Sequence, residues 1–214
     1  MKKKSTKVLV EIAIFAALAF AFDALQGGVW KSVFPNGGSI GLAMVPILII
    51  CYRRGLGAGI ACGAIVSFIQ TLGGIYVIQG ENFTNPFLRV CGPFIQVCLD
   101  YLLAYTVVGF AGVFMKKYKQ TSKIGYIIAG VALGGGLKYL CHFLAGVIFW
   151  PGEMWGVSGA WYSLLYNGLY CVPNIILCGI LMVIFALKYN NLIVPNDFEN
   201  IKPLAEDKGG ETNE

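Results

Sequence analysis

Two ionisable side chains lie one helical turn apart inside an apolar stretch of the sequence. Lys138 and His142 belong to LKYLCHFLAGVIFW, residues 137–150. Gln96 and Asp100 are likewise four residues apart inside a second apolar stretch, PFIQVCLDYLLAYTVVGFAGVFM. A charged side chain near the centre of a bilayer costs roughly 2.5–3.5 kcal/mol, so it normally faces a partner or a cavity. These four side chains are therefore candidates for the polar groups of a binding site.

A third apolar stretch adds amides and aromatic rings. Asn167, Tyr170 and Asn174 recur at helical spacing, which predicts a polar stripe on one face of a helix. Taken singly, these groups also fit structural roles, such as an ion pair between Lys138 and Asp100 or hydrogen bonds between helices. Together they have the composition of a small-molecule pocket with aromatic walls and a few convergent polar groups. A carboxylate beside aromatic faces suits a flat cationic ligand.

The composition indicates that the helices carrying these residues lie in a membrane. Of the 214 residues, 57% are hydrophobic and 13% are charged, against roughly 25% charged in a soluble domain. A membrane-spanning helix needs about 20 mostly apolar residues. We therefore predict an all-α membrane protein with six transmembrane helices, drawn from residues 8–25, 40–52, 56–78, 93–115, 124–150 and 161–187.

Basic residues set the expected orientation and domain limits. Most of them fall in alternate loops and at the ends of the chain, whereas the other loops hold only Lys31 and Arg89. Lysine and arginine are enriched on the cytoplasmic side, so both termini are predicted to be cytoplasmic. We expect residues 1–189 to form a six-helix membrane domain with an extracellular-side pocket, and residues 190–214 to form a polar, disordered cytoplasmic tail. The net charge of +5 indicates contact with anionic lipid and not with nucleic acid.

Several kinds of chemistry lack a signature in the sequence. There is no G-x-x-x-x-G-K-[ST] phosphate loop, so ATP hydrolysis by that mechanism is not expected. The seven cysteines contain no C-x-x-C pair and favour apolar packing, so we expect no metal site and no cofactor. A membrane enzyme using His142 and Asp100 as acid and base is an alternative, but no nucleophile or metal set accompanies them. We expect no catalytic residues.

Five stretches of the sequence resemble one transporter family. LKYLCHFLAGVIFW and the following WYSLLYNG resemble the thiamine-specific substrate-binding subunit, or S component, of energy-coupling factor (ECF) vitamin transporters. QVCLDYLLAY, VEIAIFAALAFAF and GGVWKSVFPNGGSIGL resemble the same family. The resemblance extends to about Leu187. An S component for another flat vitamin, such as riboflavin or a biotin-like ring, remains the alternative.

The resemblance implies which residues contact the vitamin. Thiamine is then the transported ligand and not a cofactor, held near the extracellular face. Asp100 is expected to balance the thiazolium charge or bond the aminopyrimidine, the aromatic residues to stack on the rings, and Asn167 to fix the ligand's orientation. Lys138 leaves open whether phosphorylated thiamine is also bound, and Tyr76 is a candidate match for a pocket tyrosine of the family. The expected substrate-binding residues are Trp30, Asp100, Tyr101, Lys138, His142, Trp150, Tyr162 and Asn167.

The resemblance also implies partners and a location. Transport would require an ECF membrane coupling subunit and two cytoplasmic ATPases, with the S component tipping within the bacterial cytoplasmic membrane. Ala13, Ala17 and Ala21 resemble the small-residue face that docks on the coupling subunit. Small residues allow helices to approach closely, so packing inside this chain is the alternative reading of the same face.

Overall fold

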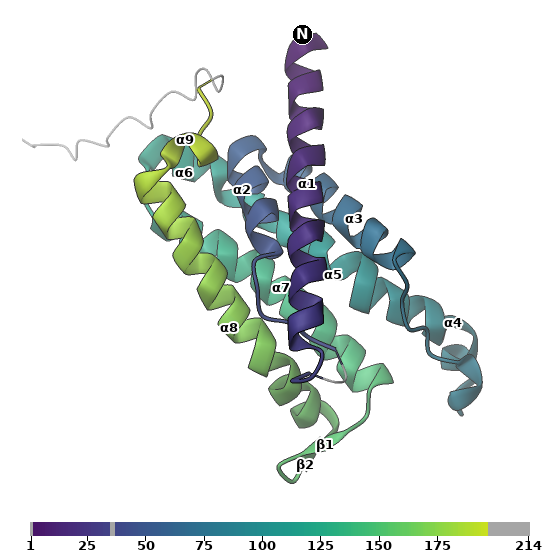
Figure 1. The fold of residues 1–214 in the computed structure, drawn as a ribbon. Coiled ribbons are helices and arrows are strands. Elements are labelled where there is room, and N and C mark those ends of the chain that lie inside the picture. The colour runs from purple at the N-terminus through teal and green to yellow at the C-terminus, as the bar shows by residue number, and fades with distance from the viewer. Residues whose placement is uncertain (1, 35–36, 197–214) are drawn as a thin grey trace, which may run out of the picture.

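The chain forms a bundle of helices, closed at one end by a short hairpin (Figure 1). The computed structural model describes residues 2–34 and 37–196. The α-helices are α1 (Lys2–Trp30), α2 (Met44–Arg54), α3 (Leu56–Leu72), α4 (Pro86–Val97), α5 (Leu103–Thr106), α6 (Met115–Thr121), α7 (Gly125–Phe149), α8 (Gly159–Lys188) and α9 (Asn190–Ile193). The remaining elements are the helical turns η1 (Gly80–Asn82), η2 (Cys98–Leu102) and η3 (Val107–Phe114) and the antiparallel strands β1 (Glu153–Met154) and β2 (Val157–Ser158).

Four segments of the described chain are long and apolar enough to cross a membrane. They are Thr6–Trp30, Pro86–Thr121, Gly125–Phe149 and Gly159–Lys188. They correspond to the predicted first, fourth, fifth and sixth spans, although the first extends five residues beyond the predicted limit of 25. The two glycines before Trp30, Gly27 and Gly28, lie within the helix, because glycine lowers helix stability by about 1 kcal/mol without preventing it. The helical membrane fold is confirmed at this level, and the count of six spans stays a prediction.

The predicted second and third spans are shorter than the others. α3 has 17 residues and α2 only 11. Every residue of α2 from Met44 to Tyr52 is buried, so this helix is enclosed by its neighbours on all sides. Pro46 is tolerated because it lies in the first turn, where backbone N–H groups have no helical partner. The described residues between α1 and this buried helix, 31–34 and 37–43, form no helix or strand.

The segment Pro86–Thr121 is one helical rod whose winding changes along its length. Asn85 caps its start, because its side chain accepts hydrogen bonds from the backbone N–H groups of Phe87 and Leu88. The turn η2 is a π-helix and η3 is a 3₁₀-helix, so an underwound turn is followed by an overwound one. Asp100 and Tyr101 lie in the π-helical turn, a feature that is frequent at functional sites.

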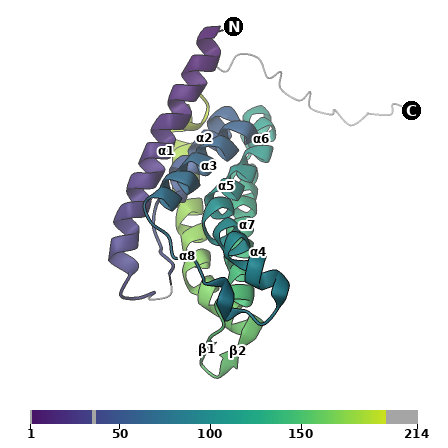
Figure 2. The same ribbon diagram turned by 90° about the vertical axis from the view of Figure 1, so that its right-hand side faces the viewer.

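Basic residues gather at the end of the bundle that carries the N-terminus. Arg53 and Arg54 both bind the carboxylate of Glu11, at 2.9 Å and 2.5 Å. Arg53 also donates to the backbone carbonyls of Asn191 and Leu192, which ties α1, α2 and the α9 segment together. Figure 2 shows α6 and the N-terminus at this end and the β1–β2 hairpin at the other. Asn190–Ile193 form α9 within the segment predicted to be a tail, and residues 197–214 lie outside the described residues.

Glycines allow η3 to pack directly on α3. A Cβ atom added to Gly109 would lie 2.6 Å from the Cα of Ile60, closer than real side chains approach backbone. Gly59 and Gly63 on α3 face Gly109 and Thr106 in the same way. Gly55, one turn before Gly59, instead provides the turn between α2 and α3 with a φ of 92°.

This contact generates the first prediction. Gly109→Ala should destabilise the protein, because overpacking against rigid backbone costs about 1–3 kcal/mol. The melting temperature of the purified protein in detergent measures the loss. Gly57→Ala is the matched control, since a Cβ there meets nothing within 4 Å. Equal melting temperatures for the two variants would contradict the packing argument.

Candidate functional site

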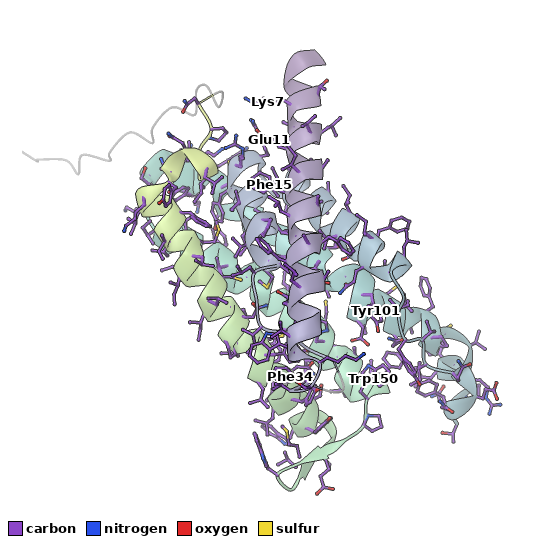
Figure 3. The ribbon with its side chains drawn as sticks, viewed as in Figure 1. Lys7, Glu11, Phe15, Phe34, Tyr101 and Trp150 are labelled. Atoms are coloured by element: carbon purple, nitrogen blue, oxygen red, sulfur yellow. The ribbon has the colours of Figure 1, made fainter. Side chains whose placement is uncertain are left out.

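A cavity of about 430 Å³ lies between α1, the segment 31–43, the Pro86–Thr121 rod, α7 and α8. It is near the end of the bundle that carries the hairpin, as the positions of Phe34, Tyr101 and Trp150 in Figure 3 indicate. Seven of the eight residues expected to bind ligand line it: Asp100, Tyr101, Lys138, His142, Trp150, Tyr162 and Asn167. Side chains from separate helices therefore converge on one recess of a size typical for small-molecule sites.

Asp100 is held by hydrogen-bond donors from two segments, α4 and the end of α7. Its Oδ2 accepts hydrogen bonds from Nε1 of Trp150, at 2.9 Å, and from Nε2 of Gln96, at 3.2 Å. Nδ1 of His142 lies 3.7 Å from Oδ1. Oδ1 therefore retains capacity to accept hydrogen bonds from a ligand, since an ionised carboxylate offers about four lone-pair sites.

Gln96 connects Asp100 to the loop before α4. Its side chain is fully buried, donates to the carbonyl of Tyr76 at 3.3 Å and accepts from the N–H of Ile78 at 3.4 Å. The hydroxyl of Tyr101 accepts from the N–H of Tyr76. Tyr76 places its ring 5.5 Å from that of Trp150 but is largely exposed. The loop thus forms a border of the cavity on the side of Asp100.

Lys138 points to a different partner from the one considered in the sequence. Its Nζ lies 3.6 Å from the centre of the Tyr105 ring, an arrangement that gives a cation–π attraction. Among the described residues Lys138 forms no ion pair with Asp100, which interacts with His142 instead. The two ionisable residues on α7 therefore face opposite parts of the cavity, His142 beside Asp100 and Lys138 beside Tyr105.

A cluster of aromatic rings forms the α8 side of the cavity. The rings of Tyr162 and Tyr166 stack at 5.7 Å, and Tyr170 meets Phe34 edge-on at 5.5 Å and His142 at 6.0 Å. Tyr162, Tyr166 and Tyr170 recur at helical spacing and so present one face. This face and the carboxylate of Asp100 border the same cavity, which fits a planar organic cation.

Asn167 binds other parts of the protein as well as facing the cavity. Its Nδ2 donates to the carbonyl of Ser163 at 2.9 Å and to that of His142 at 3.3 Å, and its Oδ1 accepts from the hydroxyl of Tyr170. Gly146 permits this contact between α7 and α8, because an added Cβ would lie 3.1 Å from Asn167 Nδ2. The stripe of Asn167, Tyr170 and Asn174 is thus partly structural, and the predicted ligand contact of Asn167 stays a prediction.

Trp30 is the expected residue that does not line the cavity. It is the last residue of α1. The backbone N–H groups of Val33 and Phe34 both donate to its carbonyl oxygen at 2.9 Å. Its ring packs at 5.8 Å on Phe34, which does line the cavity. Trp155 and Trp161, which precede Tyr162, are 74% and 67% exposed, whereas Tyr162 is buried.

Sequence reasoning missed several lining residues. Phe34 and Tyr166 carried no distinctive signal, because aromatic residues are frequent throughout this chain. Asp23, Gln70 and Tyr105 also line the cavity and bond to one another: Asp23 accepts from Tyr105 at 2.5 Å and from Gln70 at 3.0 Å. The carboxylate of Asp23 within an apolar stretch was the available signal, and the partners lie on helices too distant in sequence to be paired with it.

The cavity chemistry suits an organic ligand and not a metal ion. Within residues 2–34 and 37–196 there is no group of three or more histidine, cysteine or acidic side chains able to hold a metal. Two carboxylates, two ammonium groups, an imidazole and a wall of rings can instead hold a flat ligand by charge and stacking.

Similarity to known proteins extends along almost the whole chain. The family model described as thiamine transporter protein matches residues 9–194. The thiamine transporter ThiT of Bacillus subtilis is 29% identical over 193 residues, covering 86% of this chain and 93% of the relative. ThiT of Lacticaseibacillus paracasei is 30% identical over 193 residues, covering 85% and 89%.

A solved structure shares the fold. ThiT from Listeria monocytogenes superimposes with a TM-score of 0.66 at 27% identity, covering 90% of this chain and all of that one. With the apolar helices, these relatives show a multi-pass bacterial membrane protein and not an enzyme. The match of the family model to residues 9–194 shows that this chain belongs to the thiamine transporter protein family.

Proposed function

We propose that this protein is the high-affinity thiamine-binding S component of an ECF-type importer. The observation that carries the proposal is a cavity of about 430 Å³ in which Asp100 lies among aromatic rings. Thiamine combines a cationic thiazolium ring with an aminopyrimidine. A carboxylate can neutralise the first or accept hydrogen bonds from the second, and flat aromatic faces attract both rings.

The proposed ligand contacts divide between the two ends of the cavity. Asp100 and His142 serve the charged or hydrogen-bonding ring, with Trp150 holding Asp100 in place through its Nε1 donor. Tyr101, Tyr162 and Asn167 complete the walls, and Trp30 acts through Phe34. Lys138 lies at the other end, where it can approach a polar substituent of the ligand.

We further propose six spans with both termini in the cytoplasm. The buried α2 and the 17-residue α3 count as the second and third spans. Support comes from the clustering of Arg53, Arg54 and Lys119 at the end that carries the N-terminus, since Lys119 Nζ donates to the carbonyl of Arg53 at 2.8 Å. Basic residues favour the cytoplasmic side, so we infer that the cavity at the opposite end faces the exterior.

The outward face of α1 is proposed to dock on a coupling subunit driven by two cytoplasmic ATPases. Ala13, Ala17 and Ala21 are all exposed in the isolated chain, whereas Ala16 and Ala19 are buried against it. This distribution argues against packing inside this chain as the purpose of the three exposed alanines. A smooth face permits close and reversible helix contact.

The central prediction concerns ligand identity. Purified protein should show quenching of tryptophan fluorescence on addition of thiamine, with sub-micromolar affinity, because Trp150 borders the cavity. Riboflavin and biotin should leave the signal unchanged. A flat thiamine titration together with binding of either other vitamin would overturn the proposed function, and mass spectrometry of a copurified small molecule gives an independent answer.

Asp100→Asn tests the role of the carboxylate. Affinity for thiamine should fall by about tenfold or more, because a hydrogen bond to a charged group contributes roughly 1.5–3 kcal/mol. Isothermal titration calorimetry measures the change, and the melting temperature of the ligand-free protein checks folding. Glu153→Gln removes an exposed carboxylate at the same end of the bundle and should leave the affinity unchanged. Unchanged affinity in Asp100→Asn would refute its proposed contact.

Ala17→Trp tests the docking face. The bulky ring should abolish thiamine uptake by cells but leave binding to the purified protein intact, because Ala17 lies on the exposed face of α1, away from the cavity-lining residues. Ile128→Trp on α7 adds the same ring at another exposed position and should preserve uptake. Uptake that survives in Ala17→Trp would refute docking through this face.

A further inference from the structure

One buried glutamine of α1 holds the segment that leads into α2. Gln26 is 7% exposed, and its Nε2 donates to Oγ of Ser39 at 2.9 Å. Its Oε1 accepts from the backbone N–H of Ala43 at 3.3 Å. Gly41 lies against the same side chain, because an added Cβ would come within 2.9 Å of Gln26 Cβ and Cδ. Gln26 therefore contacts three positions along residues 39–43.

Two further side chains orient Gln26. Its Nε2 lies 3.4 Å from Oδ1 of Asp23 and 3.4 Å from the hydroxyl of Tyr105. The Tyr105 hydroxyl itself donates to Asp23 Oδ1 at 2.5 Å, and Gln70 donates to Oδ2 at 3.0 Å. The carboxylate is thus the common acceptor of a network that spans α1, α3 and α5. With these acceptors and donors in place, the amide of Gln26 has a defined orientation toward the loop.

Ser39, which accepts the hydrogen bond from Gln26, belongs to one wall of the cavity. Lys31, Phe34, Gly37, Gly38 and Ser39 all line it. The opposite edge of this wall is attached to α8, where Asn174 Oδ1 accepts from the N–H of Gly41 at 3.2 Å and Tyr166 donates to the carbonyl of Gly37 at 3.0 Å. On the α1 side, Gln26 forms side-chain hydrogen bonds with Ser39 and Ala43. Residues 37–43 are therefore hydrogen-bonded to side chains of both α1 and α8.

We propose that Gln26, oriented by Asp23 and Tyr105, is a positioning residue that fixes the 37–43 wall over the cavity and thereby slows escape of the bound ligand. The part concerning the ligand rests on the proposed thiamine-binding function. The part concerning the wall does not, because it depends only on hydrogen bonds within the ligand-free protein. Asp23 acts here through Gln26, as an acceptor that keeps the amide turned toward Ser39 and Ala43.

The test replaces the hydrogen bonds of Gln26 while keeping its size. Gln26→Met preserves the length of the side chain but neither donates nor accepts. Gln26→Glu keeps the shape and the acceptor for Ala43, loses the donor for Ser39, and brings a carboxylate toward Asp23. In ligand-free protein, amide hydrogen exchange of residues 37–43 should accelerate about tenfold or more in both variants, as expected for the loss of one or two hydrogen bonds. Exchange in α7 should not change.

The second measurement separates binding from release. The thiamine dissociation rate, followed by stopped-flow tryptophan fluorescence, should rise about tenfold, with the association rate changed much less. Leu25→Ala, an exposed neighbour on α1, should leave both exchange and dissociation as in the unaltered protein. Ser39→Ala removes the loop partner without altering a helix, and should reproduce the faster exchange if the Gln26 variants fail to fold.

The outcomes distinguish the two proposals. Unchanged exchange of residues 37–43 in Gln26→Met and Ser39→Ala overturns the positioning role, whatever the protein binds. Faster exchange with an unchanged dissociation rate overturns the retention of ligand. If the unaltered protein binds no thiamine, the proposed function fails, while the exchange measurement still decides whether Gln26 fixes the wall.

Discussion

The need to satisfy polar groups inside an apolar bundle determines how this protein is built. In hydrocarbon there is no water to bond an exposed backbone or side-chain group, and each unsatisfied one is costly. Gln96 meets this constraint by bonding to two backbone groups of a loop and to Asp100. Gln26 and Asn174 do the same for the segment before α2. Polar side chains of the helices thereby secure non-helical backbone that would otherwise have no partner.

The same constraint explains why the cavity lies where it does. α2 has 11 residues, and at 1.5 Å per residue it covers only about half of a hydrocarbon layer of about 30 Å. In the other half its place is taken by irregular chain, whose side chains pack less completely than a helix. The large apolar core accordingly contains Ile47, Leu48 and Ile50 of α2, whereas the cavity lies beside residues 31–39. A short buried helix thus provides compact packing at one end and space for a ligand at the other.

Local sequence signals predicted the limits of the long helices better than the side-chain contacts between helices. The long apolar stretches around Lys138 and Asn167 correspond closely to α7 and α8, because period and length alone define such helices. Asp100, His142 and Trp150 were recognisable because charged or family-specific residues stand out in an apolar context. The pairing of Lys138 with the Tyr105 ring was not predictable, since it depends on how two helices rotate against each other. The lining by Phe34 depends likewise on the path of the segment 31–43, which no periodic pattern specifies.

The change of winding within the Pro86–Thr121 rod has a consequence for how the protein can vary. A π-turn advances by a smaller angle per residue than an α-helix and a 3₁₀-turn by a larger one. The directions in which Asp100 and Gly109 point from the helix axis are therefore set by two different kinds of turn along one continuous backbone. Substitutions that rotate Asp100 about the helix axis can therefore be accommodated in the π-helical turn, so that the contact of Gly109 with α3 keeps its register while the lining of the cavity changes.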